Sequence, residues 1–421
     1  MSSEFEKKLE KYAEVILNVG LNLQKGQRLL IGASNPSNRG TPLELASFVR
    51  VIVRKAYQMG ARFVEVLWDD PQLRLIRFMH APRDSFEELA TWRREAQLEF
   101  AENEDAVLAI GGQDPELFVN QDSELIVTEG KSVSKHFKPV MDLLVKNAFN
   151  WTAIVAPVDG WTEKVFPDLS LDDQTTNFWE IIFEVCRINY DDPVSAWQEH
   201  ISQLVARCEY LNLKKYKSLK LEAPGTDITI GLPKGHIWGS ALFETPSGIG
   251  FVGNIPTEEV FTLPHRDKTE GVVKATKPLY YRESVIEDFT LTFSKGKVIK
   301  ATASKGQEFL EGLIKFDEGA SRIGEIALIP NSSPISQSGL LFYNSLLDEN
   351  ASCHIALGRA YQFSLQNGEK MSDEEFIAAG GNVSLIHMDF MIGSEEMDID
   401  GITEDGTAEP IIRDGEWAFE V

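Results

Sequence analysis

The last strong strand signal in the chain reads NVSLIHMDFMIG and covers residues 382–393. In a β-strand, residues two positions apart point to the same face, so we expect His387 and Asp389 side by side, with Met388 and Phe390 facing the core. A carboxylate among apolar side chains is costly unless it is paired or ligates a metal. For an isolated His-x-Asp pair a buried hydrogen bond is the more common outcome, so a metal site requires further ligands elsewhere in the chain.

Further candidate ligands lie in apolar or glycine-rich segments of the second half of the chain. They are Glu259 in NIPTEEVFTLP (254–264), Glu325 in RIGEIALI (322–329), and Glu349 and His354 in LDENASCHIALGRAY (347–361). Each acid alone has an ordinary structural explanation, since paired acids often cap helices and a lone strand acid often marks a sheet edge. In an extended chain Glu258 and Glu259 face opposite ways, so one could be solvated while the other points into the core.

Taken together, the candidate side chains are four carboxylates and two imidazoles. This donor set suits a pair of hard-to-borderline divalent ions such as Zn, Co or Mn. A cluster of cysteines, typical of a structural zinc site, is absent from the sequence. The sequence therefore indicates a metal site in its second half, although the ligands are scattered and form no compact motif.

The composition limits the partners of the protein. The formal net charge is −24 and the sequence pI is about 4.8, which argues against nucleic acid and anionic membrane because both need a basic surface. No run of about 18 apolar residues is present, so no membrane span is expected. The charged N-terminal segment lacks the apolar core of a signal peptide, and three widely spaced cysteines indicate free thiols. These features favour a cytoplasmic globular protein.

The first half of the chain alternates short apolar strands with longer helices. The strands are expected near residues 28–32, 63–68, 106–110 and 152–156. This alternation is typical of βαβ units and predicts a mostly parallel sheet with helices on both faces.

From Ser218 onward short alternating segments dominate, including a hairpin signal with its turn at Lys295-Gly296. We therefore predict an N-terminal α/β domain with a mostly parallel sheet over residues 1–213. A β-rich α+β metal-binding and catalytic domain is expected over residues 214–421.

The quoted segments resemble those of the M29 metallopeptidases, the bacterial aminopeptidase T and aminopeptidase S type. The resemblance lies in residues 254–262, 324–325, 348–358 and 387–393, which occur in the family's order and at closely similar intervals. It extends over the whole chain. It implies a cytoplasmic exopeptidase that uses two divalent ions to remove N-terminal residues from peptides, and that works as a homodimer.

The resemblance also implies a set of site residues. The family's metal ligands fall on Glu259, Glu325, Glu349, His354, His387 and Asp389. The family's active-site tyrosine falls on Tyr361, which on sequence grounds alone would be interpreted as a core tyrosine.

The mechanism implied is amide hydrolysis at two metal ions, with Glu325 or Asp389 as a bridging carboxylate. A water shared by the ions loses a proton near neutral pH, and the Tyr361 hydroxyl donates to the tetrahedral oxyanion. A further carboxyl group must carry a proton to the leaving amine, and Glu258 and Glu349 are the candidates.

Two alternatives remain open at the level of sequence. The first is a two-metal phosphoesterase, for which His265, Arg266 and Arg359 are the nearest bases that could bind phosphate. The second is a non-catalytic binding protein whose buried acids are structural.

Overall fold

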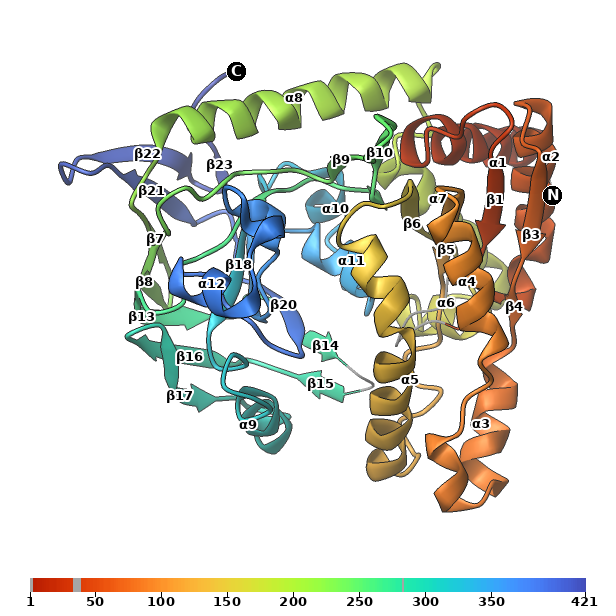
Figure 1. Cartoon of the computed structure of the whole chain (residues 1–421), viewed down its shortest axis with the longest axis horizontal. Helices are drawn as coiled ribbons and strands as arrows, with labels where there is room; N and C mark the ends of the chain where they lie inside the picture. The colour runs from red at the N-terminus through yellow and green to blue at the C-terminus, as the bar shows by residue number, and fades with distance from the viewer. Residues whose placement is uncertain (1–2, 33–38, 282–283) are drawn as a thin grey trace. The chain divides into compact units, whose positions relative to one another are not determined.

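The computed structural model describes residues 3–32, 39–281 and 284–421. The chain forms two compact units (Figure 1). Unit 1 comprises Met1–His200 and Ala241–Pro256, and unit 2 comprises Ile201–Ser240 and Thr257–Val421. One helix, α8 (Pro193–Lys214), contains the first boundary. The assignment of residues 1–213 and 214–421 to separate functional domains stays a prediction.

Unit 1 is built on a sheet with strand order β11-β6-β5-β1-β3, in which neighbouring strands are parallel. Its strands are β1 (Arg28–Ile31), β3 (Phe63–Val66), β5 (Ala106–Gly111), β6 (Trp151–Val155) and β11 (Asn254–Ile255). The central strands β1 and β5 are almost fully buried, as expected for runs of Leu, Ile, Val and Ala covered on both faces. The predicted α/β architecture with a mostly parallel sheet is confirmed.

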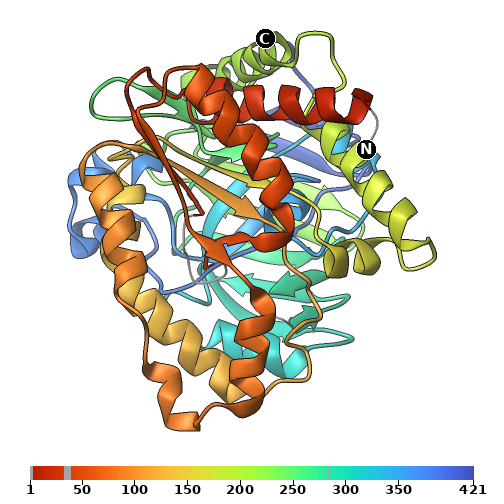
Figure 2. The same cartoon turned by 90° about the vertical axis from the view of Figure 1, so that its right-hand side faces the viewer.

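Helices flank the strands of unit 1. They are α1 (Ser3–Val15), α2 (Ala46–Gln58), α3 (Pro71–His80), α4 (Trp92–Glu102), α5 (Ser123–Leu144), α6 (Asp159–Val165) and α7 (Leu171–Val185). Asp70 and Asp122 cap the starts of α3 and α5 by accepting hydrogen bonds from the backbone N–H groups of Gln72 and Glu124. Helix α1 packs against α2, and α4 against α5. Figure 2 shows these helices, coloured red to yellow-green, after a quarter turn.

Two short strand pairs complete unit 1. They are β2 (Thr41–Pro42) with β4 (Trp68–Asp69), and β9 (Leu242–Glu244) with β10 (Gly250–Val252). The segment that contains β9, β10 and β11 follows the first part of unit 2 in the sequence and returns to unit 1.

Unit 2 holds two antiparallel sheets. The larger has the order β17-β16-β13-β8-β7-β21-β22-β23, and the smaller the order β12-β18-β19-β20. The strands of the larger sheet are β7 (Ser218–Ala223), β8 (Thr226–Gly231), β13 (Thr269–Lys274), β16 (Thr290–Ser294), β17 (Lys297–Thr302), β21 (Asp398–Ile402), β22 (Ala408–Arg413) and β23 (Glu416–Trp417). Those of the smaller sheet are β12 (Val260–Thr262), β18 (Ile323–Leu328), β19 (His354–Gly358) and β20 (His387–Met391).

The predicted hairpin is confirmed as β16–β17. Its turn residues Lys295 and Gly296 both have positive φ, at 49° and 75°, as a two-residue hairpin turn requires. A further short pair joins β14 (Leu279–Tyr281) to β15 (Ser284–Ile286). The remaining helices of unit 2 are α9 (Gln307–Ile314), α10 (Pro334–Gln337), α11 (Ser345–Glu349) and α12 (Asp373–Ala378).

The core of unit 2 contains apolar side chains from both of its sheets. Phe289, next to β16, contacts Phe390 of β20 with ring centroids 5.1 Å apart. Met388 and Phe390 are fully buried in this core, whereas His387 and Asp389 alternate with them and are only partly buried. The alternation expected for this strand is confirmed, and it directs the His and Asp side chains to the face of the small sheet away from the core.

The cysteines and the helices test what the composition predicted. The three cysteines, Cys186, Cys208 and Cys353, are buried, and none forms a disulfide within the described residues. Within the described residues, no helix combines the length and the apolar character needed to cross a membrane.

Candidate metal centre

Three neighbouring strands place two of the predicted ligands in one row. Ala356 of β19 is the register partner of both Glu325 on β18 and Asp389 on β20. Register partners point to the same face of a sheet, so both carboxylates lie on one face with only an alanine methyl group between them. The small Ala356 side chain leaves the space above it to the two acids.

The two histidines lie on the same face because each is two residues from this row. His354 precedes Ala356 on β19 and His387 precedes Asp389 on β20. The Nε2 atom of His387 is 3.1 Å from Asp389 Oδ1 and 3.4 Å from Glu325 Oε2. The smaller sheet therefore collects two acids and two imidazoles from three strands.

Glu259 joins the cluster from the segment just before β12. Its Oε2 atom is 3.4 Å from His354 Nε2, and both side chains are at most 9% exposed. Its neighbour Glu258 is also buried, at 4% exposure. The expectation that one of these two acids would be solvated is therefore wrong. Both precede the first residue of β12, so the strict alternation of a strand does not apply to them.

The side chains form two groups with metal-ligand spacing. Glu259, Glu325 and His354 make one group, and Glu325, His387 and Asp389 make the other. Within each group the donor atoms lie within 4.8 Å of one another. Glu325 belongs to both groups, so the two groups adjoin.

Glu349, the sixth predicted ligand, lies in neither group. It is the last residue of the short helix α11. Burial raises the pKa of Glu349 well above its usual value, and the charges of Asp389 and Glu259 raise it further. Its carboxyl group is therefore close enough to interact electrostatically with both groups.

Burial and the charge of His387 shift the pKa values of Glu325 and Asp389 in opposite directions. Burial raises the pKa of Glu325, and the nearby imidazole of His387 offsets only part of this effect. For Asp389 burial acts in the same direction, but the charge and hydrogen bond of His387, together with the charge of His354, outweigh burial and lower the pKa. Proximity to His387 thus keeps Asp389 ionised while Glu325 retains a tendency to hold a proton.

Both imidazoles become more basic. Burial lowers the pKa of His354, but the hydrogen bond and charge of Glu259, together with the charges of Asp389 and Glu325, outweigh burial and raise the pKa to about 10. Burial also lowers the pKa of His387, but the charges of Asp389 and Tyr361 and the hydrogen bonds to Asp389 and Glu325 together outweigh burial and raise the pKa well above the usual value. In the metal-free chain the cluster therefore holds protons that a bound cation would displace.

The residues fit divalent metal ions. Glu325 Oε2 and Asp389 Oδ1 are buried, and neither atom has a hydrogen-bond partner of acceptable geometry among the described residues. Buried acceptors without a partner are costly, as are several like charges in one place. The surrounding set of carboxylate oxygens and imidazole nitrogens is the one that such ions take in proteins.

Tyr361, the predicted active-site tyrosine, lies against the second ligand group. Its ring centroid is 5.1 Å from that of His387, and Phe363 stacks on it at 5.1 Å and 13°. The charge of His387 lowers the pKa of Tyr361, but burial and the charges of Glu325 and Asp389 outweigh this and raise it. The phenol keeps its proton near neutral pH and is available as a donor.

Glycines allow the three ligand-bearing strands to converge. A β-bulge interrupts the pairing of β18 and β19 between Ile323 and Glu325. A Cβ atom at Gly324 would lie 2.4 Å from the carbonyl oxygen of Gly358. A Cβ atom at Gly358 would lie 2.2 Å from that of Ile386, at a φ of 105°. Only glycine fits these two positions, and the bulge sets the direction of Glu325.

Two residues that support the site, Asn350 and Asp348, were not identified from the sequence as site residues. Asn350 is fully buried, and its Oδ1 atom accepts a hydrogen bond of 2.8 Å from the backbone N–H of Glu258. Asp348 is buried beside Glu349 and accepts hydrogen bonds from the backbone N–H groups of Phe342 and Asn344. Burial raises the pKa of Asp348 to about 6. These contacts depend on the tertiary fold, and residue type alone does not distinguish such side chains from surface ones.

The chain matches a family model, curated relatives and a solved structure along almost its whole length. The family model described as thermophilic metalloprotease (M29) matches residues 5–417. The chain is 44% identical over 419 residues to Aminopeptidase 2 of Geobacillus stearothermophilus, with 100% of both chains covered. It is 39% identical over 413 residues to Aminopeptidase T of Thermus thermophilus, with 98% of this chain and 99% of the relative covered.

The solved structure of wild-type AmpT from Thermus thermophilus superimposes with a TM-score of 0.92 at 38% identity. It covers 99% of this chain and 100% of its own. The similarity therefore includes both units and the segments that carry the candidate ligands. The chain belongs to the M29 metalloprotease family, as a metal-dependent aminopeptidase.

Proposed function

We propose that the chain uses two divalent ions and an activated water to hydrolyse the N-terminal peptide bond of peptides. The observation that carries this proposal is the sharing of Glu325 by both ligand groups. Two-metal hydrolases hold their ions about 3.5–4 Å apart, which requires adjoining ligand sets with a common member.

The proposed ligands are the six residues expected from the sequence. Glu259, Glu325 and His354 would hold one ion, and Glu325, His387 and Asp389 the other. Glu349 would add a carboxylate from α11. Bound ions would neutralise the repulsion among the carboxylates and occupy the acceptor positions at Glu325 and Asp389.

When bound, the ions supply Lewis acidity and lower the pKa of the attacking water. The chain's own groups supply the rest. Tyr361 donates its phenolic hydrogen to the oxyanion of the tetrahedral intermediate, a role for which its raised pKa suits it. The fully buried strand β19 excludes bulk water from one side of the site.

Two buried carboxyl groups remain candidates for carrying a proton to the leaving amine. Glu349 has a pKa raised by burial and by Asp389 and Glu259, which suits a group that holds a proton. Glu258 is buried next to Glu259 and lies outside both ligand groups. If Glu258 is the carrier, its removal lowers the rate with the full metal content retained, whereas removal of Glu349, which is also a proposed ligand, lowers the metal content as well.

The acidic site also accounts for cleavage at the first residue only. A free α-ammonium group of the substrate is attracted by the carboxylates, whereas an internal amide carries no charge. The relatives named above are aminopeptidases. Peptides with a free N-terminus are therefore the proposed substrates.

Zn, Co or Mn as the native metal, a homodimeric assembly and a cytoplasmic location stay predictions. Family membership removes the non-catalytic alternative, because M29 members are enzymes. The phosphoesterase alternative is disfavoured, since the curated relatives are peptidases across their whole length.

A substrate screen tests this proposal. We expect turnover of an amino-acid p-nitroanilide with a free amino group, and none of its N-acetylated form, because acetylation removes the positive charge. p-Nitrophenyl phosphate should not be cleaved. Equal turnover of the free and acetylated anilides would contradict the aminopeptidase proposal, and turnover of the phosphate ester alone would establish the phosphoesterase.

Tyr361→Phe removes the proposed oxyanion donor and keeps the ring that stacks on Phe363. We expect kcat on the p-nitroanilide to fall by about 10²–10³-fold with little change in KM, since this hydrogen bond forms only in the transition state. Steady-state kinetics together with metal analysis measure the effect. A parental kcat at parental metal content would remove Tyr361 from the mechanism.

A further inference from the structure

We propose that Asn382 is a positioning residue of the metal centre, which fixes the backbone carbonyl group that orients His387. The inference rests on the proposed role of His387 as a ligand. Asn382 lies five residues before β20 and is fully buried. A buried amide is retained where both of its N–H groups find acceptors, so its hydrogen bonds indicate what it holds in place.

Asn382 forms hydrogen bonds with the residues immediately before and after Arg359, in the segment that follows β19. Its Nδ2 atom donates to the carbonyl oxygen of Gly358 at 2.6 Å, and its backbone carbonyl accepts from the N–H of Ala360 at 2.9 Å. A second Nδ2 hydrogen bond, of 2.9 Å, reaches the carbonyl oxygen of Gly319. The amide orientation follows from these partners, because the flipped amide would set its oxygen against two carbonyl oxygens.

Arg359, the residue between these two contacts, determines the tautomer and the ring orientation of His387. Its carbonyl oxygen is 2.7 Å from His387 Nδ1, and its N–H donates to the carbonyl of Ile386 at 2.7 Å. A carbonyl only accepts, so the imidazole hydrogen is on Nδ1. In the neutral imidazole this leaves the Nε2 lone pair directed toward Glu325 and Asp389. A carbonyl that fixes the tautomer and ring orientation is the usual partner of a metal-binding histidine.

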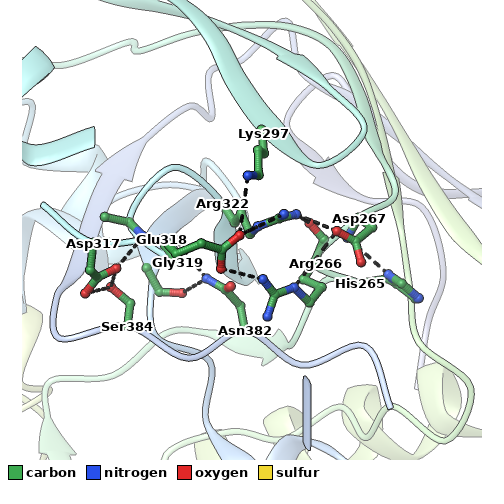
Figure 3. Close-up of polar contacts among 12 residues, drawn as sticks. His265, Arg266, Asp267, Lys297, Asp317, Glu318, Gly319, Arg322, Asn382 and Ser384 are labelled. Atoms are coloured by element: carbon green, nitrogen blue, oxygen red, sulfur yellow. Dashed lines mark hydrogen bonds and ion pairs between the residues drawn. The ribbon is translucent and has the colours of Figure 1, made fainter. Parts of the chain in front are cut away.

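The other acceptor, Gly319, belongs to a loop whose Glu318 carboxylate pairs with two buried arginine side chains (Figure 3). Glu318 contacts Arg266 at 2.6 Å and Arg322 at 3.2 Å, and both arginine side chains are 7% exposed. Arg322 also pairs with Asp267 at 2.6 Å. Displacing this loop would withdraw the Glu318 carboxylate from two buried guanidinium groups, which is unfavourable. The loop is therefore a rigid support for Asn382.

The segment that leads into β20 is tied to the same loop. The Ser384 hydroxyl and the N–H of Leu385 both donate to Asp317, at 2.8 Å and 2.7 Å. Figure 3 shows Asn382 and Ser384 reaching toward residues 317–319. His387 is thus held from two directions, by the start of its own strand and by the carbonyl of Arg359, and Asn382 takes part in both.

The alternative is that Asn382 only satisfies buried carbonyl groups and stabilises the fold. Asn150 of unit 1 is a matched control, because it is also fully buried and its Nδ2 atom donates to the carbonyl of Leu21 at 2.6 Å. Replacing either asparagine with alanine is expected to lower the stability of the fold. A change in metal binding at constant ligand composition is specific to a positioning residue.

The experiment compares Asn382→Ala, Asn150→Ala and His387→Ala as metal-free proteins. Zn²⁺ affinity is measured by competition with a chromophoric chelator, and ligand geometry by the visible absorption of the Co²⁺-loaded forms. We expect Asn382→Ala to weaken Zn²⁺ binding by about 10–100-fold and to alter the Co²⁺ spectrum. Asn150→Ala should lower the unfolding temperature and leave Zn²⁺ affinity and the Co²⁺ spectrum at parental values.

Parental Zn²⁺ affinity and an unchanged Co²⁺ spectrum in Asn382→Ala, with weakened binding in His387→Ala, would overturn the positioning role and leave the ligand assignment intact. Unchanged binding in His387→Ala would instead contradict the ligand assignment itself. Equal changes in Asn382→Ala and Asn150→Ala would also overturn the inference. If Asn382→Ala does not fold, Asn382→Ser, which keeps a small hydrogen-bonding side chain, is tested against the same outcomes.

Discussion

Replacing Glu325 with glutamine is expected to lower kcat/KM on an amino-acid p-nitroanilide by at least about 10³-fold, or about 4 kcal/mol of transition-state stabilisation. Glu325 is the one residue common to both ligand groups, so its loss weakens both proposed ion sites at once. Glutamine has the same shape, and its neutral amide binds divalent ions far less strongly than a carboxylate. The metal content of the purified variant should fall in parallel.

The same substitution should stabilise the metal-free protein. Glu325 is buried among other carboxyl groups, and its Oε2 atom lies 3.4 Å from His387 Nε2 without forming a well-aligned hydrogen bond within the described part of the chain. Glutamine is neutral at every pH, so it avoids the desolvation cost and the repulsion by Glu259 and Asp389 that raise the pKa of Glu325. Thermal unfolding in the presence of a chelator should therefore occur at a higher temperature in Glu325→Gln than in the parent.

Glu129→Gln in unit 1 is a control matched for burial. The Glu129 side chain is 0% exposed and pairs with Arg39 and Arg74, so its neighbours are cations. Here the substitution should lower the unfolding temperature and leave metal content at the parental level. A Glu325→Gln variant with parental activity and metal content would contradict the ligand assignment, and destabilisation of both metal-free variants would contradict the repulsion argument.

Removing the metal is the second change with a large expected effect. Chelation should abolish p-nitroanilide hydrolysis, and Co, Zn or Mn should restore it. Bound metal should also stabilise the fold, by about 2.7 kcal/mol when the free ion is at 100 times its Kd. Full activity in thoroughly chelated enzyme would show that the metal-dependent mechanism is wrong.

The stabilisation by metal should increase with pH. In the metal-free chain, burial lowers the pKa of His354, but Glu259, Asp389 and Glu325 together outweigh burial and raise it to about 10, against an unfolded value of about 6.5. The stability that His354 contributes is therefore complete below about pH 6.5 and is lost as the pH rises toward about 10. Glu349, whose pKa is also raised, acts in the same direction.

A cation binds only the deprotonated ligands, so its affinity rises over the same pH range. The difference in unfolding temperature between metal-bound and chelated protein should be larger at about pH 9 than at about pH 6.5. Thermal unfolding followed by circular dichroism at the two pH values measures it. A difference that shrinks with rising pH would show that the protonated imidazoles do not compete with the metal.

Much of the fold could be predicted because local patterns determine it. Apolar runs such as Ala106–Gly111 and the alternation in His387–Met391 identify strands, and the order of helices and strands implies a parallel sheet. The pairing of Asn254–Ile255 with the parallel sheet of unit 1 could not be predicted in this way. That strand is two residues long and lies about a hundred residues after its partner in the sequence, so no local pattern indicates the pairing.

In the candidate site too, contacts between residues distant in the sequence could not be predicted from local patterns. The sequence identified the residue types of the ligands, but the sharing of Glu325 depends on the register of β18 with β19, and the bulge at Gly324 shifts that register. The burial of both Glu258 and Glu259 follows from the path of the chain before β12. Asn382 gave no signal at all, because its role consists of hydrogen bonds to backbone groups distant in the sequence.

The central claim is that one chain binds two ions at a site that includes Glu325. Elemental analysis of the metal-free protein after reconstitution with Zn²⁺ and extensive dialysis tests it most directly. Two equivalents of zinc per chain in the active parent, and fewer than two in Glu325→Gln, are the predicted result. A fully active parent that retains one equivalent or none would contradict the account.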